Sequence, residues 1–116
     1  MRAIITDLDR TLLRTDKTIS EYTLDIMRKC HDRGFAIMAA TARPERSILQ
    51  YHKQICFDAI TSMNGARTIL PNSVLENGIS PLSGKYVLSK LVLMPDALIS
   101  VETRDGIYAN GEIPEW

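Results

Sequence analysis

Two aspartates near the start of the chain, Asp7 and Asp9, have the chemistry of a reactive or cation-binding site. They stand two residues apart shortly after the apolar run 3–5, and the hydroxyl of Thr11 follows them. A carboxylate at the end of a buried strand loses solvation energy unless it binds a cation or reacts. The alternative is an ordinary strand and turn in which Asp9 or Thr11 caps the loop. The two acids alone leave both interpretations open.

The elements that must position these carboxylates alternate along the chain. Residues 2–6 are short, apolar and β-branched, which predicts a buried strand. Ser20 is a good N-cap for a helix, and Gly34 is placed to end that helix. The continuous apolar run 35–40 predicts a second strand. Strand, helix and strand in so short a stretch indicate a βαβ unit, with parallel strands and a right-handed crossover.

A second helix and a third strand continue the pattern. Pro44 suits the first turn of a helix, and residues 58–63 form a third short strand that Asn64 and Gly65 end. Helical spacing predicts an inner face on each helix, made of Ile19, Tyr22, Ile26, Met27 and Cys30 in the first and of Ile48, Leu49, Tyr51 and His52 in the second.

Polar residues follow the second and third strands as well as the first. Thr41 and Arg43 close the second strand, and Asn64 closes the third. Because the carboxyl ends of parallel strands meet at one edge of a sheet, we expect these side chains to lie near Asp7 and Asp9. Each has an ordinary alternative: Thr41 as a helix cap, Arg43 as a solvated charge and Asn64 as part of a turn.

The second half of the chain changes character. Residues 67–70 and 73–76 flank a Pro-Asn turn and predict a hairpin, and Ser83 could cap a helix that Pro95 stops. A second hairpin is expected where Asp105 and Gly106 separate two short apolar runs. These elements look antiparallel, so we expect a first domain over residues 1–65 and a second over residues 66–116.

Composition excludes several classes of protein. The 116 residues carry 14 basic and 14 acidic side chains, and this balance gives no support for nucleic-acid binding. No apolar run has the ~20 residues that a membrane span needs. Cys30 and Cys56 lack the spacing of metal ligands or of a disulfide framework. A reduced, cytoplasmic protein is therefore the expectation, with both cysteines as small apolar core residues.

The order and spacing of four motifs resemble those of the haloacid dehalogenase-like hydrolases, in particular their Cof-type sugar-phosphatase branch. The motifs are Asp7-Leu8-Asp9-Arg10-Thr11-Leu12-Leu13, Thr41-Ala42-Arg43, Asn64-Gly65-Ala66 and Thr103-Arg104-Asp105-Gly106-Ile107-Tyr108. The resemblance implies an α/β fold: a three-layer Rossmann-like core with a parallel sheet, here partial, and a partial α+β cap.

The resemblance also implies a role for each site residue. Asp7 would attack phosphorus to give an aspartyl-phosphate, and Asp9 would act as general acid and then general base. A Mg²⁺ ion would be held by Asp7 and Asp9, through the carboxylate of the first and the backbone carbonyl of the second. Thr41 would donate to a phosphoryl oxygen, while Arg43 and Asn64 would face the leaving group of a small phosphorylated metabolite such as a sugar phosphate.

The chain departs from the family pattern in three places. Arg10 and Ala42 stand where the family usually has glycine, so side chains would reshape the site. The phosphate-binding lysine and the later acidic metal motif of the family are not found. We therefore expect the first half of the core with part of the cap, and little hydrolysis from it alone, because losing one charge-stabilising donor costs ~10²–10³ in rate.

Two other functions are compatible with the sequence. The first strand, central in the family, would become a bare apolar edge here, which invites pairing with another chain. The chain could thus be a non-catalytic remnant that binds phosphate or a partner, or that forms a homo-oligomer through this edge. A phosphomutase-type phosphotransferase would share Asp7 and Asp9.

Overall fold

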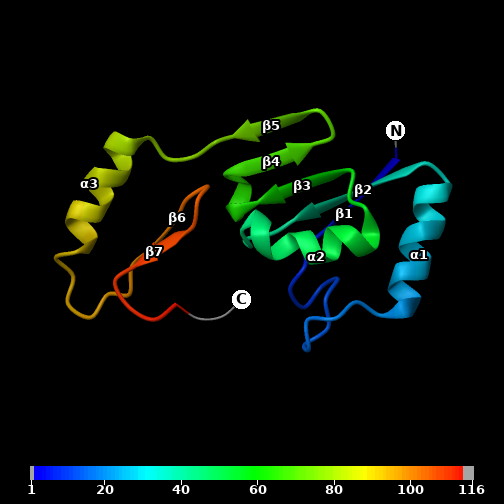
Figure 1. Ribbon diagram of the computed structural model, residues 1–116, viewed down its shortest axis with the longest axis horizontal. Helices are drawn as coiled ribbons and strands as arrows, with labels where there is room; N and C mark the ends of the chain where they lie inside the picture. The colour runs from blue at the N-terminus through cyan, green and yellow to red at the C-terminus, as the bar shows by residue number, and fades with distance from the viewer. Residues whose placement is uncertain (1, 114–116) are drawn as a thin grey trace. The chain divides into compact units, whose positions relative to one another are not determined.

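The computed structural model describes residues 2–113, which fold as two compact units, Met1–Asn77 and Gly78–Trp116 (Figure 1). The first unit contains a five-stranded sheet with the order β1-β2-β3-β4-β5. Its strands are β1 (Arg2–Thr6), β2 (Phe35–Ala40), β3 (Ala59–Ser62), β4 (Arg67–Leu70) and β5 (Ser73–Glu76). The strands predicted over 2–6, 35–40, 67–70 and 73–76 are confirmed, but β1 is not the expected buried strand: three of its five residues are exposed and none is buried.

The sheet is parallel where the chain alternates with helices and antiparallel where it forms a hairpin. β1 pairs in parallel with β2, with Ile4 opposite Ile37, and β2 pairs in parallel with β3. β4 and β5 then extend the sheet by antiparallel pairing. Arg67 strengthens this extension, because its guanidinium forms ion pairs with Glu45 and with Glu76.

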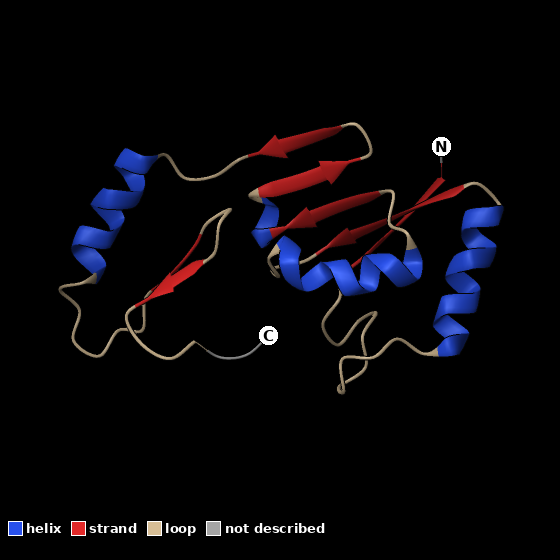
Figure 2. Cartoon of the chain, viewed as in Figure 1, coloured by secondary structure: helices blue, strands red, loops and turns tan. Residues whose placement is uncertain are grey.

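Two helices cover one face of this sheet. They are α1 (Glu21–Asp32) and α2 (Glu45–Ile55), and Ser20 caps α1 by accepting a hydrogen bond from the Thr23 amide (3.0 Å). Right-handed crossovers between strands in the order β1-β2-β3 place both helices on the same face, as the cartoon shows (Figure 2). The core between helices and sheet contains Leu8, Leu12, Leu13, Ile19, Leu24, Ile37, Ala39, Ile48, Tyr51, Ile55, Phe57 and Ile60.

Three predicted inner-face residues are instead exposed: Tyr22 and Ile26 of α1 and Leu49 of α2. Leu24 is the buried residue of α1, and Met27 and Cys30 pack against the core beside it. Of the two cysteines expected in the core, Cys56 is instead exposed, because it caps the end of α2 in a left-handed conformation. The stripe that reaches the core is narrower than the sequence pattern indicates, because the sheet beneath α1 ends at β1. β1 is an edge strand, as expected, and Ile5 on it is 68% exposed.

The second unit contains α3 (Pro81–Leu91) and a two-stranded sheet of β6 (Ser100–Glu102) and β7 (Ile107–Ala109). α3 begins earlier than predicted, because Ser80 rather than Ser83 is its N-cap and Pro81 occupies the first turn. The hairpin forms at the expected turn, and the Thr103 amide donates to the Gly106 carbonyl (2.8 Å).

The division between the units lies after Asn77, twelve residues (77 − 65) beyond the expected domain boundary. Pairing of β4 to β3 explains this position, because it joins the first hairpin to the parallel sheet. That the second unit is part of a cap stays a prediction. Among the described residues, no helix is long and apolar enough to cross a membrane.

Candidate active site

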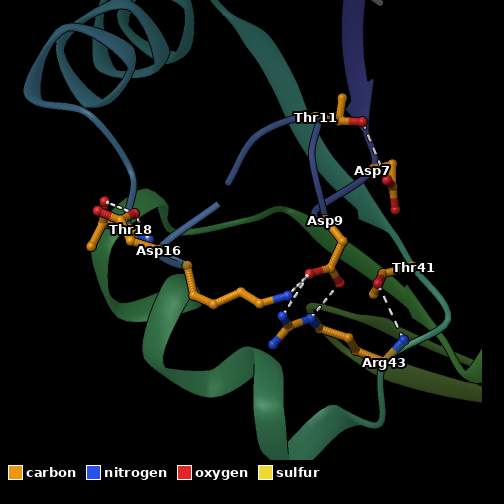
Figure 3. Close-up of polar contacts among 8 residues, drawn as sticks. Asp7, Asp9, Thr11, Asp16, Thr18, Thr41 and Arg43 are labelled. Atoms are coloured by element: carbon orange, nitrogen blue, oxygen red, sulfur yellow. Dashed lines mark hydrogen bonds and ion pairs between the residues drawn. The ribbon is translucent and has the colours of Figure 1, made fainter. Parts of the chain in front are cut away.

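The end of β1 turns sharply, so that leucines enter the core and aspartates point away from it. The amides of Leu12 and Leu13 donate to the carbonyls of Asp7 (3.3 Å) and Leu8 (2.8 Å), and all three leucines are buried. Asp7 is exposed, and the Thr11 hydroxyl donates to its Oδ2 (3.3 Å), as drawn in Figure 3. Burial of the leucines therefore fixes the backbone that presents both carboxylates.

Asp9 is held by a buried arginine. Arg43 donates from Nε to Asp9 Oδ2 (2.6 Å) and from Nη2 to Asp9 Oδ1 (2.7 Å), in the two-pronged geometry that guanidinium and carboxylate groups favour (Figure 3). Only 2% of Arg43 is exposed, and its guanidinium lies 5.7 Å from the centre of the Tyr51 ring. Arg43 is thus no solvated surface charge.

This pairing changes the acidity of both groups. Hydrogen bonds from Arg43, reinforced by Lys17, hold the pKa of the Asp9 carboxyl well below its usual range. The same hydrogen bonds raise the pKa of the Arg43 guanidinium. Asp9 is therefore a carboxylate at neutral pH, which is the form of a general base.

Lys17 is a site residue that the sequence did not reveal. Its Nζ donates to Asp9 Oδ1 (2.7 Å) from a tight turn. Two backbone hydrogen bonds close that turn, from the Lys17 amide to the Arg14 carbonyl (3.0 Å) and from the Arg14 amide to the Thr18 carbonyl (2.9 Å). Lys17 has a φ of 66°, a conformation that lysine seldom adopts, so periodicity and spacing give no signal for it.

The loops after β2 and β3 are joined by backbone hydrogen bonds. The Met63 amide donates to the Arg43 carbonyl (3.0 Å), and the Asn64 amide donates to the Thr41 carbonyl (3.3 Å). The Thr41 hydroxyl accepts from the Arg43 amide (3.2 Å), and so it stabilises this loop rather than the first turn of α2. Asn64 is exposed and has a φ of 54°, which asparagine tolerates better than most residues.

The structure thus brings the predicted residues to one edge of the sheet, some through side-chain contacts and others through backbone hydrogen bonds between loops. Asp9 contacts Arg43 directly, and the loop of Asn64 is bonded to that of Thr41. Figure 3 shows Asp7 and Asp9 on the segment after β1, with Asp9 bonded to Arg43 of the loop that also carries Thr41.

Metal-binding capacity at this edge is limited to oxygen ligands on the first turn. The described residues contain no group of three or more His, Cys, Asp or Glu side chains that could hold a metal. Mg²⁺ keeps several water ligands and needs only one or two carboxylates, so the exposed Asp7 carboxylate fits it. The Asp9 side chain is already bonded to Arg43 and Lys17, so of the two aspartate side chains that of Asp7 fits a cation better.

A parallel βαβαβ unit with two carboxylates at its first strand end defines a Rossmann-like α/β protein with polar side chains at the carboxyl ends of its strands. The profile of the haloacid dehalogenase-like hydrolases matches residues 4–114, and the chain belongs to that family.

Individual relatives agree with this assignment. The chain is 44% identical over 64 residues to the 5-amino-6-(5-phospho-D-ribitylamino)uracil phosphatase YitU of Bacillus subtilis, a match over 54% of this chain and 24% of that protein. The phosphatase BT1666 of Bacteroides thetaiotaomicron has a similar structure, with a TM-score of 0.81 and 25% identity over 98% of this chain and 43% of that one. TM0651 of Thermotoga maritima is similar with a TM-score of 0.75 and 25% identity, over 97% of this chain and 43% of that one.

The chain spans less than half the length of these relatives. Its family and its α/β fold class are confirmed.

Proposed function

We propose that this chain carries the nucleophile and the acid–base residue of a Mg²⁺-dependent phosphomonoester hydrolase of the Cof type. One observation carries the proposal: the exposed Asp7 carboxylate follows β1 two residues before an Asp9 carboxylate that Arg43 fixes in place. The substrate class is a small phosphorylated metabolite such as a sugar phosphate, and the expected location is the cytoplasm. Membership of the hydrolase family and similarity to phosphatases support the proposal.

Asp7 is the proposed nucleophile. An Oδ atom of Asp7 attacks phosphorus, the bond from phosphorus to the ester oxygen breaks, and an aspartyl-phosphate forms. Thr11 supports this role, because its hydroxyl bonds Asp7 Oδ2 and leaves the other carboxylate oxygen free of that contact. Water then attacks the intermediate and releases inorganic phosphate.

Asp9 is the proposed acid and base. As a carboxylate it takes a proton from the water that attacks the aspartyl-phosphate. The lowered pKa keeps Asp9 in this form, but it also makes Asp9 a weak base until the hold of Arg43 and Lys17 loosens. In the first step the leaving oxygen receives a proton. Asp9 can supply it only after taking up a proton from solvent, which requires that the hold of Arg43 and Lys17 loosen. Substrate that draws either cation away would have this effect.

The remaining residues bind the phosphoryl group and its surroundings. Mg²⁺ would be held by the Asp7 carboxylate and the Asp9 carbonyl, and it would offset the charge of the phosphoryl oxygens. Thr41 would donate its hydroxyl proton to one of those oxygens while accepting from the Arg43 amide. Asn64 would face the leaving group. Arg43 would act there only after releasing Asp9, because both described contacts of its guanidinium with a carboxylate are to that residue.

A second function is favoured by the exposed edge of the sheet. β1 is an edge strand and Ile5 is exposed on it, so the chain could form a homo-oligomer, or act as a binding module, through this edge. Sedimentation analysis tests the homo-oligomer directly, because a monomer at all concentrations would contradict it.

Beryllofluoride, a mimic of the aspartyl-phosphate, tests the proposed nucleophile even where turnover is slow. We expect a Mg²⁺-dependent ¹⁹F signal of the bound group, together with slow hydrolysis of an aryl phosphate. Asp7→Asn should abolish both, while Asp25→Asn, which changes an aspartate on the surface of α1 that pairs with Lys29, should change neither. Wild-type protein that gives no signal and no hydrolysis would overturn the proposal.

A further inference from the structure

The turn over residues 14–18 is built to hold a lysine against the site. Asp16 Oδ1 accepts from the amide (3.0 Å) and the hydroxyl (2.7 Å) of Thr18, which fixes the backbone on one side of Lys17. Lys17 itself adopts a left-handed conformation, with a φ of 66°, which is strained in a residue with a Cβ. A surface ion pair adds little to stability, so the contact with Asp9 does not by itself explain this arrangement as a stabilising device.

The two cations on Asp9 differ in what they can do next. Arg43 is almost fully buried and uses two nitrogens on Asp9. The side chain of Lys17 is 50% exposed, and an ammonium group has three donors. Lys17 can therefore meet a ligand from solvent without leaving the site, whereas Arg43 must first break its pair.

We infer that Lys17 is a substrate-binding residue, whose ammonium group moves from Asp9 to an anionic oxygen of the phosphomonoester when the substrate binds. The inference rests on the proposed function, and it adds a residue to which neither the sequence motifs nor the family resemblance assigned a role. The ligand chemistry is that of a phosphate dianion close to the Asp9 carboxylate.

The charges at the site make this transfer favourable. Asp9 carries one negative charge that two cations share, while a phosphate dianion offers more charge to a single ammonium group. When Lys17 leaves, Asp9 keeps both hydrogen bonds from Arg43 and is not left unpaired. Lysine also suits the task, because its flexible stem lets a compact charge move between two acceptors.

Affinity for inorganic phosphate tests the inference without any need for turnover. We expect the full chain with Mg²⁺ to bind phosphate, and Lys17→Met to weaken binding about tenfold or more, the effect of one charge-assisted hydrogen bond. Lys17→Arg should retain affinity within about threefold, because it keeps a cation at the site. Lys53→Met, on an exposed lysine of α2, is the matched control and should bind as the wild type does.

Each outcome decides the question. Equal affinity of Lys17→Met and wild type, or no binding by wild type, would overturn the inference. If the beryllofluoride signal on Asp7 persists in that case, only the inference fails and the proposed function stands. Thermal unfolding of each variant shows whether lost binding comes from lost structure. Phosphate added to the wild type should shift the ¹⁵N resonance of the Lys17 ammonium group. No shift at a phosphate concentration that saturates the protein would overturn the inference.

Discussion

The two units of this chain differ in how they use apolar residues. In the first unit, the core residues lie between Leu8 and Ile60 and are shared by the sheet and both helices. In the described part of the second unit no residue is buried, and its exposed large apolar residues are Ile79, Leu82, Tyr86, Val87, Val92, Leu93, Met94, Leu98 and Tyr108. Similar apolar patterns thus give a core in one unit and open surface in the other.

This difference in burial shows which unit can hold the side chains of a site in fixed positions. A site needs side chains held by packing, and Leu8, Leu12 and Leu13 supply this beneath Asp7 and Asp9. α3 has equally regular capping, through Ser80, but no buried face that would fix it. Local signals are therefore enough to form a helix in either unit, while a precise carboxylate geometry requires the packed core of the first.

The largest effect should come from matched truncations in the two units. Ile48 of α2 is 0% exposed and Leu82 of α3 is 81% exposed. We expect Ile48→Ala to lower the free energy of unfolding by about 3 kcal/mol, through lost burial and a cavity, and Leu82→Ala to change it by less than ~0.5 kcal/mol. Urea unfolding followed by circular dichroism measures both. Equal losses would mean that Leu82 is buried in solution, and the contrast between the units would then be wrong.

The fold could be predicted from the sequence wherever a short apolar run was bounded by strong end signals. Ser20 and Gly34 marked the ends of α1, and Gly34 has the expected positive φ of 78°. Which side of α1 is buried could not be predicted, because that depends on where the sheet ends. Tyr22 and Ile26 fit a helical stripe but lie beyond the part of the helix that meets the core.

The site could be predicted as a set of strand ends but not as a set of contacts. Topology alone brings Asp9, Arg43 and Asn64 to one edge. That Arg43 bonds Asp9, 34 residues earlier in the chain, depends on side-chain packing against Tyr51, for which local pattern carries no signal. Lys17 was missed because its position depends on a left-handed lysine, where a reader of the sequence would expect glycine or asparagine.

The next effect separates the two cations of the site. Arg43→Met leaves Asp9 without its buried partner, and we expect a loss of about 2–3 kcal/mol in unfolding free energy. This is below the ~3–5 kcal/mol of a fully buried pair, because Asp9 is 35% exposed and keeps Lys17. Lys17→Met should cost less than ~1 kcal/mol. Urea unfolding compares the two variants. A larger loss for Lys17→Met than for Arg43→Met would mean that Lys17, and not Arg43, is the cation that stabilises the fold.

A smaller effect is expected from pH. Since the pKa of Asp9 is lower in the folded protein than in the unfolded chain, its contribution is fully present above the unfolded pKa of about 3.9. That contribution is lost as pH falls below this value toward the folded pKa, where the folded carboxylate also takes up a proton. Asp9→Asn should therefore show a weaker loss of stability between about pH 5 and pH 2 than the wild type. Melting temperatures across this range measure it, and parallel curves would contradict the pairing with Arg43.

The smallest effect compares two positions at which the family usually has glycine. Arg10 has a φ of 58°, so Arg10→Gly removes a left-handed Cβ at the cost of a more flexible unfolded chain. The balance should raise the free energy of unfolding by up to ~1 kcal/mol. Ala42 is not among the described residues with positive φ, so Ala42→Gly gains nothing in the folded state and should lower stability by ~0.4–1 kcal/mol. A gain in unfolding free energy for Arg10→Gly together with a loss for Ala42→Gly would show that only the backbone at position 10 favours glycine. The same sign at both positions would mean that the turn at Asp9 relaxes around its side chain, so that Arg10 is not strained.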